Sequence, residues 1–203
     1  MNPIDDMPPE RLLELRSVAK EINPRSLDKV PPRYSAAELT HPQVRAWADQ
    51  HAAAIATSWP SNKPISMRPS LLIAGPVGTG KTHNSFAAVR YIASLGVPVV
   101  FQYVKHADMV AAGRYKSGFS PREHFDRLTK TPLLIIDDLG TADDPDGLTA
   151  RVIDTRYDNL DATIFTSNFA SKQIADMLGE RVASRLAETC RVVNLTGDDR
   201  RRQ

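Results

Sequence analysis

Several features that would mark a specialised class of protein are scarce in this 203-residue sequence. It has one cysteine, Cys190, so no disulfide can form within the chain, and a reducing compartment is indicated. No apolar run approaches the roughly 18 residues that span a bilayer. Residues 1–9 lack the apolar stretch of a secretion signal. We therefore expect a cytoplasmic protein that does not insert into a membrane.

An excess of one charge sign is also lacking, because the formal net charge is only +2. Such a balance neither demands nor excludes nucleic acid as a partner, so any basic surface must be local. There is no internal repeat and no low-complexity tract. The length fits one domain with an appendage better than two full domains.

Prolines punctuate the first third of the chain and separate two predicted helices. The first helix is expected from Pro9 to Ile22, and the second begins near Pro42 and reaches Ile55. Residues 23–37 between them are predicted to be a linker, because proline removes a donor and biases its predecessor away from helix. We expect residues 1–60 to form a short helical N-terminal segment and 61–203 the main domain. The apolar stripe of the first helix would either dock on a partner or pack on the protein's own core.

From Ser70 onward, predicted strands alternate with predicted helices. This alternation indicates an α/β fold with a mostly parallel sheet and helices on both faces. The predicted strands are 70–74, 97–103, 132–136, 163–166 and 191–195. The predicted helices are 81–95, a mixed region over 107–129, 148–159, and the segment up to 187.

A glycine-rich loop joins the first of these strands to the helix that follows. Its residues are Gly75, Pro76, Val77, Gly78, Thr79, Gly80, Lys81 and Thr82. The glycines let backbone N–H groups turn toward a polyphosphate, and the helix N-terminus adds partial positive charge. We expect the loop to bind ATP with Mg²⁺, Lys81 bridging the β- and γ-phosphates and Thr82 serving as a metal ligand. The alternative is a glycine-rich turn with a solvated lysine.

Two carboxylates follow the buried strand 132–136. Asp137 and Asp138 would face the crevice beside the glycine loop, where open α/β sheets bind ligands. We expect Asp137 to hold Mg²⁺ and Asp138 to orient the attacking water. The alternative is that both carboxylates, Asp138 in particular, merely cap the loop before Gly140.

Further polar residues follow in the C-terminal part. Asn168, after the next strand, is placed to hydrogen-bond the γ-phosphate or the water. Arg181 and Arg185 lie four residues apart on one helical face, so either could reach the γ-phosphate of a neighbouring subunit. Their alternative is a surface salt bridge with Glu180 or Glu188.

Four segments in this order resemble the AAA+ ATPases of the DnaC/DnaI helicase-loader and IstB group. They are GPVGTGKT at 75–82, LLIIDDLG at 133–140, IFTSN at 164–168 and ERVASRL at 180–186. The resemblance implies a P-loop NTPase three-layer sandwich with five strands, the acidic strand central, and no large helical lid after Leu195. It also implies Walker A and Walker B roles for the first two segments, sensor I for Asn168, and the box VII arginine for Arg185, with Arg181 as alternate. The dipeptide Arg156-Tyr157 also resembles the group, and we interpret it as packing.

The resemblance implies that the chain loads a DnaB-type replicative helicase onto single-stranded DNA as a homo-oligomer formed through its ATP sites. The region between the two Walker motifs would then contact DNA, since cations interleaved with aromatics suit phosphate neutralisation and base stacking. The expected DNA-binding residues are Lys105, His106, Arg114, Tyr115, Lys116 and Phe119. The alternative is a solvated helical face. Two other functions stay open: an IstB-like transposition regulator acting on duplex DNA, and a nucleotide-gated DNA-binding adaptor with little turnover.

Overall fold

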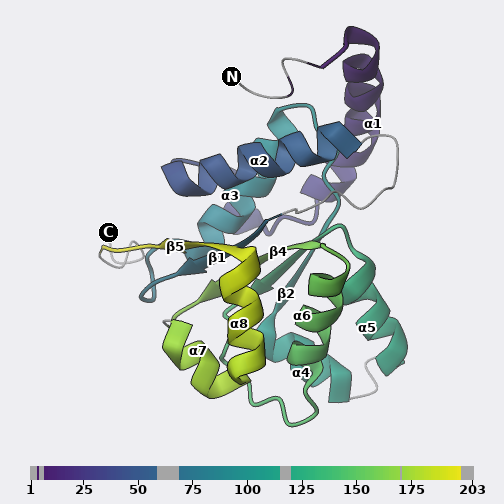
Figure 1. The fold of residues 1–203 in the computed structure, drawn as a ribbon. Coiled ribbons are helices and arrows are strands. Elements are labelled where there is room, and N and C mark those ends of the chain that lie inside the picture. The colour runs from purple at the N-terminus through teal and green to yellow at the C-terminus, as the bar shows by residue number, and fades with distance from the viewer. Residues whose placement is uncertain (1–3, 5–6, 59–68, 115–119, 170, 198–203) are drawn as a thin grey trace. The chain divides into compact units, whose positions relative to one another are not determined.

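The computed structural model describes residues 4, 7–58, 69–114, 120–169 and 171–197 (Figure 1). The chain divides into two compact units. Unit 1 comprises Met1–Arg68 and His83–Val100, and unit 2 comprises Pro69–Thr82 and Phe101–Gln203. The predicted division at residue 60 did not anticipate that most of the helix after the glycine loop belongs to unit 1.

Unit 1 is helical. It contains α1 (Pro9–Leu27), the 3₁₀ turn η1 (Pro32–Tyr34), α2 (Pro42–Ser58) and the part of α3 (Lys81–Ser94) that begins at His83. The rings of Tyr34 and Phe86 stack with centroids 5.1 Å apart, and the Tyr91 hydroxyl donates to Asp49 at 2.7 Å. Leu15 and Ala19 of α1 are buried, which favours packing over docking as the role of its apolar stripe.

The first helix is longer than predicted. It continues through Pro24 to Leu27, so the linker prediction is wrong for residues 23–27. The side chain of Asn23 lies on this extra turn. Its amide donates to Val97 O at 3.0 Å, and its carbonyl oxygen accepts from Val99 N at 2.9 Å. Because the side chain holds these backbone groups, residues 97–100 are not part of a strand, contrary to prediction.

Unit 2 contains a five-stranded sheet in the order β2-β3-β4-β1-β5, and every neighbouring pair is parallel (Figure 1). The α/β prediction is confirmed. The acidic strand is not central as expected: β3 lies second from the edge, and β4 is central. The strands are β1 (Ser70–Ala74), β2 (Phe101–Lys105), β3 (Leu133–Asp137), β4 (Ala162–Ser167) and β5 (Cys190–Asn194).

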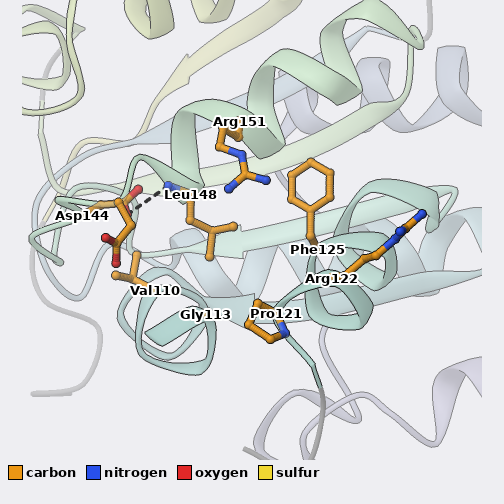
Figure 2. Close-up of a pocket in the computed structure, with 9 residues that line it drawn as sticks. Val110, Gly113, Pro121, Arg122, Phe125, Asp144, Leu148 and Arg151 are labelled. Atoms are coloured by element: carbon orange, nitrogen blue, oxygen red, sulfur yellow. Dashed lines mark hydrogen bonds between the residues drawn. The ribbon is translucent and has the colours of Figure 1, made fainter. Parts of the chain in front are cut away.

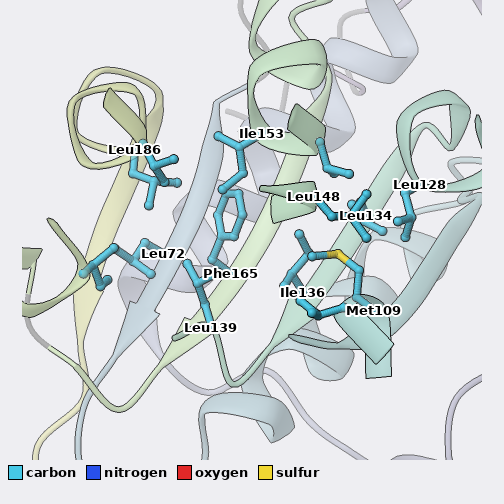
Figure 3. Close-up of a cluster of buried hydrophobic side chains, with 14 residues drawn as sticks. Leu72, Met109, Leu128, Leu134, Ile136, Leu139, Leu148, Ile153, Phe165 and Leu186 are labelled. Carbon is cyan, nitrogen blue, oxygen red and sulfur yellow. The ribbon is translucent and has the colours of Figure 1, made fainter. Parts of the chain in front are cut away.

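Five helices of unit 2 pack on one face of this sheet (Figure 3). Leu72, Ile136 and Phe165 project from the strands into a buried cluster that includes Met109 and Leu186. The helices are α4 (His106–Arg114), α5 (Pro121–Lys130), α6 (Leu148–Asp158), α7 (Ser171–Leu178) and α8 (Glu180–Thr189). Across the described ranges, no helix has both the length and the apolar character needed to cross a bilayer.

Candidate active site

The glycine loop leaves the sheet between two neighbouring strands. On the β4 side, the β1–β4 pairing continues into the loop, where Gly75 N–H donates to Ser167 O at 3.1 Å. On the β5 side, Leu195 N–H donates to Ala74 O at 2.7 Å. Gly75 has φ +150°, and a Cβ there would lie 2.3 Å from Leu195 O. Only glycine fits at this start of the loop, so its backbone path is fixed by the strands on both sides.

Lys81 folds back into the loop that precedes it. Its side chain is buried, and its ammonium donates to Gly75 O at 2.8 Å and Pro76 O at 2.7 Å. Thr79 Oγ1 also donates to Pro76 O, at 2.9 Å. A positive charge is therefore held at the loop, which contradicts the alternative of a solvated lysine.

Asp137 ends β3 and accepts hydrogen bonds from three hydroxyl groups. Thr82 Oγ1 lies 2.9 Å from Oδ1 and 3.1 Å from Oδ2. Thr166 donates to Oδ1 at 2.6 Å, and Tyr103 donates to Oδ2 at 3.0 Å. The expected proximity of Asp137 to Thr82 is confirmed. Sequence reasoning missed Tyr103, because only the register of β2 on β3 reveals that its side chain reaches this carboxylate.

The donor set fits Mg²⁺. This cation keeps several waters and is held in nucleotide sites by one or two protein oxygens together with substrate phosphates. Thr82, the last residue of the phosphate loop, provides one hydroxyl, and Asp137, at the end of β3, provides one carboxylate at hydrogen-bond distance from it. In the part of the chain that the structure describes, no cluster of three or more His, Cys, Asp or Glu residues could hold a metal by itself.

Asp138 has a left-handed backbone, with φ +56°. Its N–H donates to Thr166 Oγ1 at 2.9 Å, and Leu139 N–H donates to Thr166 O at 2.7 Å. The carbonyl oxygen of Asp138 accepts from Thr141 Oγ1 at 2.7 Å. The cap on the following loop is therefore made by the backbone of Asp138, and the role of its carboxylate stays a prediction.

Thr166, Ser167 and Asn168, at the end of β4, have different surroundings. Thr166 holds Asp137 and Asp138, as described. Ser167 Oγ donates to Leu139 O at 2.9 Å and accepts from Phe169 N at 3.1 Å. Asn168 follows β4 at the same sheet edge and is half-buried. Its predicted contact with the γ-phosphate or the water is not tested by this structure.

The comparisons with known proteins agree with this geometry. A family model described as "IstB-like ATP binding protein" matches residues 20–203. The chain belongs to this IstB-like ATP-binding family. A comparison with curated proteins found no match.

Solved structures share the fold of this IstB-like protein. The DnaC helicase loader matches with a TM-score of 0.63 and 20% identity, over 82% of this chain and 100% of its own. DnaI matches with a TM-score of 0.63 and 22% identity, over 89% of this chain and 93% of its own. AMPPCP-bound DnaA from Aquifex aeolicus matches with a TM-score of 0.63 and 20% identity, over 86% of this chain and 54% of its own. At these identities the likeness shows a shared fold.

The two arginines of the IstB-like chain share a carboxylate that the sequence analysis did not single out. Asp154 of α6 forms ion pairs with Arg185 and, at 3.1 Å, with Arg181. Neither Glu180 nor Glu188, the expected partners, is the carboxylate in these ion pairs. Glu188 instead accepts from the Tyr157 hydroxyl at 2.8 Å.

Arg156 is buried at 2% exposure and donates to five acceptors. Nε donates to Thr163 Oγ1 at 2.8 Å, and Nη2 donates to Ala162 O at 2.6 Å. Nη1 reaches the carbonyl oxygens of Leu128, Thr129 and Thr131. Arg156 thus ties α6 to β4 and to the end of α5, and its interpretation as a packing residue agrees with these contacts.

The residues expected to contact DNA differ in placement. Lys105 is exposed at the end of β2. His106 is fully buried, where its ring bonds to Thr149 Oγ1 at 2.9 Å and accepts from Ala142 N at 3.2 Å, so its inclusion as a DNA ligand is a mistake. Arg114 ends α4. The side chain of Arg114 and the whole of Tyr115, Lys116 and Phe119 lie outside the described residues.

A pocket of about 270 Å³ that the sequence did not predict lies among α4, α5 and α6 (Figure 2). The Arg151 guanidinium lies 4.9 Å from the centroid of the Phe125 ring. Asp144 accepts from Leu148 N at 3.1 Å and Thr149 N at 2.6 Å, and so caps α6. Burial alone would raise the pKa of Asp144, but the hydrogen bonds from Thr149 and Leu148 outweigh it and lower the pKa.

The thiol of Cys190, at the start of β5, is in an environment that does not favour a nucleophile. Burial raises its pKa to about 12, so the reactive thiolate is disfavoured. Cys190 therefore serves as a small hydrophobic residue at the start of β5.

Proposed function

We propose that this protein is an ATPase that loads a DnaB-type replicative helicase onto single-stranded DNA. The observation that carries the loading function is the match to the DnaC helicase loader, which covers 100% of that chain. The match to DnaI, which covers 93% of that chain, adds to it. The ATP site that such a function requires is supported by the pairing of Thr82 with Asp137 beside the glycine loop. We place this activity in the cytoplasm.

The residues of the site divide the work of hydrolysis. Lys81 would exchange the loop carbonyls for the β- and γ-phosphates, and Thr82 and Asp137 would hold Mg²⁺. When bound, the metal neutralises charge on the phosphates. Asp138 would orient and polarise the water, and Asn168 would hydrogen-bond the water or the γ-phosphate. Aspartate is one methylene shorter than glutamate, so we expect slow hydrolysis by the isolated chain and stimulation by DNA or assembly.

Assembly through the ATP sites completes the proposal. A γ-phosphate bound by one copy would meet Arg185 of a second copy, which supplies a positive charge in the transition state. Lys105, together with Arg114, Tyr115, Lys116 and Phe119, would contact single-stranded DNA.

Co-purification with a DnaB-type helicase tests the loading function. We expect association that depends on a nonhydrolysable ATP analogue and is lost in Lys81→Ala, because that variant lacks the ammonium at the phosphates. Circular dichroism of Lys81→Ala should match the parent, which separates loss of nucleotide from loss of fold. Two folded proteins that do not associate in either nucleotide state would contradict helicase loading.

The family match favours a second function. Because an IstB-like model matches residues 20–203, the same core could act as a transposition regulator that assembles on duplex DNA. Preference for duplex over single-stranded oligonucleotides, with DNA bending and association with a transposase, would support this function over helicase loading.

A nucleotide-gated DNA-binding adaptor with little turnover is the third possibility, and the aspartate at position 138 favours it. Hydrolysis that rises with single-stranded DNA and is lost in Asp138→Asn would exclude it. Nucleotide-dependent assembly without measurable phosphate release would support it.

A further inference from the structure

The two arginines on Asp154 are held to very different degrees. The side chain of Arg181 is 72% exposed, whereas that of Arg185 is 17% exposed. The Arg185 guanidinium also lies 4.7 Å from the centroid of the Tyr157 ring. A cation over an aromatic face gains most when it is partly desolvated. Arg185 is therefore fixed by a carboxylate and a ring, and Arg181 by the carboxylate alone.

The contacts of Arg185 leave part of its guanidinium available. This group carries five N–H donors in a planar fork. Asp154 contacts Nη1, and Tyr157 covers one face. Among the residues that the structure describes, the donors on Nε and Nη2 have no partner. An anion could approach this free edge while the other edge stays on Asp154.

The charge of the cluster suits an anion as well. Asp154 contributes one negative charge, and the two arginines contribute two positive charges, which leaves a net charge of +1 for the three residues. Arg181 contacts Oδ2 while Arg185 contacts Oδ1, so both carboxylate oxygens are neutralised. Asp154 therefore presents no unpaired oxygen to an arriving phosphate, and the nearby Glu188 carboxylate accepts from the Tyr157 hydroxyl at 2.8 Å.

We propose that Asp154, with Tyr157, is the positioning residue for Arg185, and holds its free edge ready for the γ-phosphate of ATP bound to a second copy of this chain. The inference rests on the proposed function, in which Arg185 acts in trans, and it assigns that role to Arg185 rather than Arg181. A charge fixed in place before the reaction needs no reorganisation when the transition state forms.

A mixture of two inactive variants tests the inference. The acceptor is Arg185→Ala, which keeps its ATP site but lacks the arginine. The donor is Lys81→Ala, which cannot use ATP but supplies Arg185. We expect each alone to be inactive and an equal mixture to hydrolyse ATP, measured as phosphate release with Mg²⁺ and a single-stranded oligonucleotide.

Asp154→Asn is then added to the donor only. Because misplacing a reacting group can lower a rate about 100-fold, we expect a loss of that order in the kcat of the mixture. The KM for ATP should change by less than about twofold, since the ATP site belongs to the acceptor. If Asp154 only supported the ATP site of its own chain, Asp154→Asn would leave the kcat of the mixture unchanged, because that site is already inactive in the donor.

Matched donor variants complete the experiment. Asp126→Asn removes a carboxylate from another helix, where it is paired with Lys130 at 2.9 Å, and should leave the mixture unchanged. Tyr157→Phe keeps the ring and should also be tolerated, whereas Tyr157→Ala should lower kcat. Thermal unfolding of each donor checks that it is folded. If the mixture of Arg185→Ala and Lys81→Ala is active, and neither Asp154→Asn nor Tyr157→Ala in the donor changes its rate, the positioning role alone is overturned. If that mixture is inactive, Arg185 does not act at the ATP site of a second copy, and the inference is overturned with that part of the proposed function.

Discussion

Gly75 has no room for a side chain where the phosphate loop begins. An added Cβ would lie 2.3 Å from the backbone oxygen of Leu195, at a φ of +150° that side chains rarely adopt. We predict that Gly75→Ala lowers the free energy of unfolding by about 2–4 kcal/mol, because the backbone directly after β5 cannot move aside as a flexible side chain could. Urea unfolding of the variant and the parent measures this difference.

Gly147 supplies the matched control for that prediction. It has φ +63°, and no atom lies within 4 Å of an added Cβ. Gly147→Ala thus introduces backbone strain without a clash, and should lower the free energy of unfolding by about 1–2 kcal/mol. Equal losses in the two variants would show that contact with Leu195 has no part in the effect.

The sequence predicted part of the site at this scale. The meeting of Thr82 and Asp137 followed from two motifs that come after β1 and β3, because the carboxyl ends of parallel strands share one edge of a sheet. The sheet places β4 between these two strands. The contact of Tyr103 with Asp137 could not be predicted in the same way. It depends on which strand lies beside β3 and in which register, and no local pattern encodes either.

At the scale of elements, α6 is anchored by the buried Arg156. We predict that Arg156→Lys lowers the free energy of unfolding by about 2–4 kcal/mol, since an ammonium cannot reach five acceptors arranged around a planar fork. Arg151→Lys on the same helix is exposed and should lower it by less than about 1 kcal/mol. Urea unfolding compares the two variants, and similar losses would contradict the anchoring role.

The start of α4 is held by a neutral histidine. Burial lowers the pKa of His106, and the nearby Asp144 only partly opposes this effect. The ring nitrogen that accepts from Ala142 N must be unprotonated, so protonation favours the unfolded chain. The stabilising contribution of His106 is therefore complete above the ordinary histidine pKa of about 6.5 and is lost as the pH falls below it.

We predict that the free energy of unfolding decreases less between pH 7.5 and pH 5 in His106→Gln than in the parent. Urea unfolding at both pH values measures the decrease. His124→Gln is the control for the loss of a histidine side chain, because it removes a half-buried ring that lies 3.1 Å from Met109 O. An identical decrease in His106→Gln and the parent would show that His106 does not titrate as its burial indicates.

The boundaries of elements show where local patterns are insufficient. The unbroken apolar run before Asp137 predicted β3 correctly, because its signal lies within the run itself. Val97–Val100 are also apolar, but they include Pro98, which has no N–H for a sheet ladder, and they are not in a strand. Asn23, far away in the sequence, bonds to the backbone of Val97 and Val99. Only the folded unit 1 shows that this side chain occupies those groups.

At the scale of the whole molecule, the DNA proposal makes a prediction about salt. If Lys105 neutralises one phosphate of single-stranded DNA, Lys105→Ala should reduce the slope of log K against log salt by about 0.7. ATP affinity should stay unchanged. Binding titrations over a range of salt concentrations measure the slope. Lys130→Ala, whose parent ammonium is paired with Asp126, is the control, and equal slopes for all three proteins would remove Lys105 from the DNA interface.

The α/β class and the sequence of strands and helices followed from the alternation of patterns along the chain. The position of each strand in the sheet did not. The resemblance implied a central acidic strand, but β4 occupies the centre, between β3 and β1. Strand order depends on pairing between segments distant in sequence, which periodicity does not report.

The left-handed turn at Asp138 determines which replacements there can be interpreted. Asparagine tolerates this backbone nearly as well as aspartate, so an amide would change the charge and preserve the turn. Glycine would remove the side chain and relax the turn. Alanine would delete the carboxylate and strain the main chain that carries Thr141 and Leu139, so a slow alanine variant could not distinguish lost chemistry from a displaced loop.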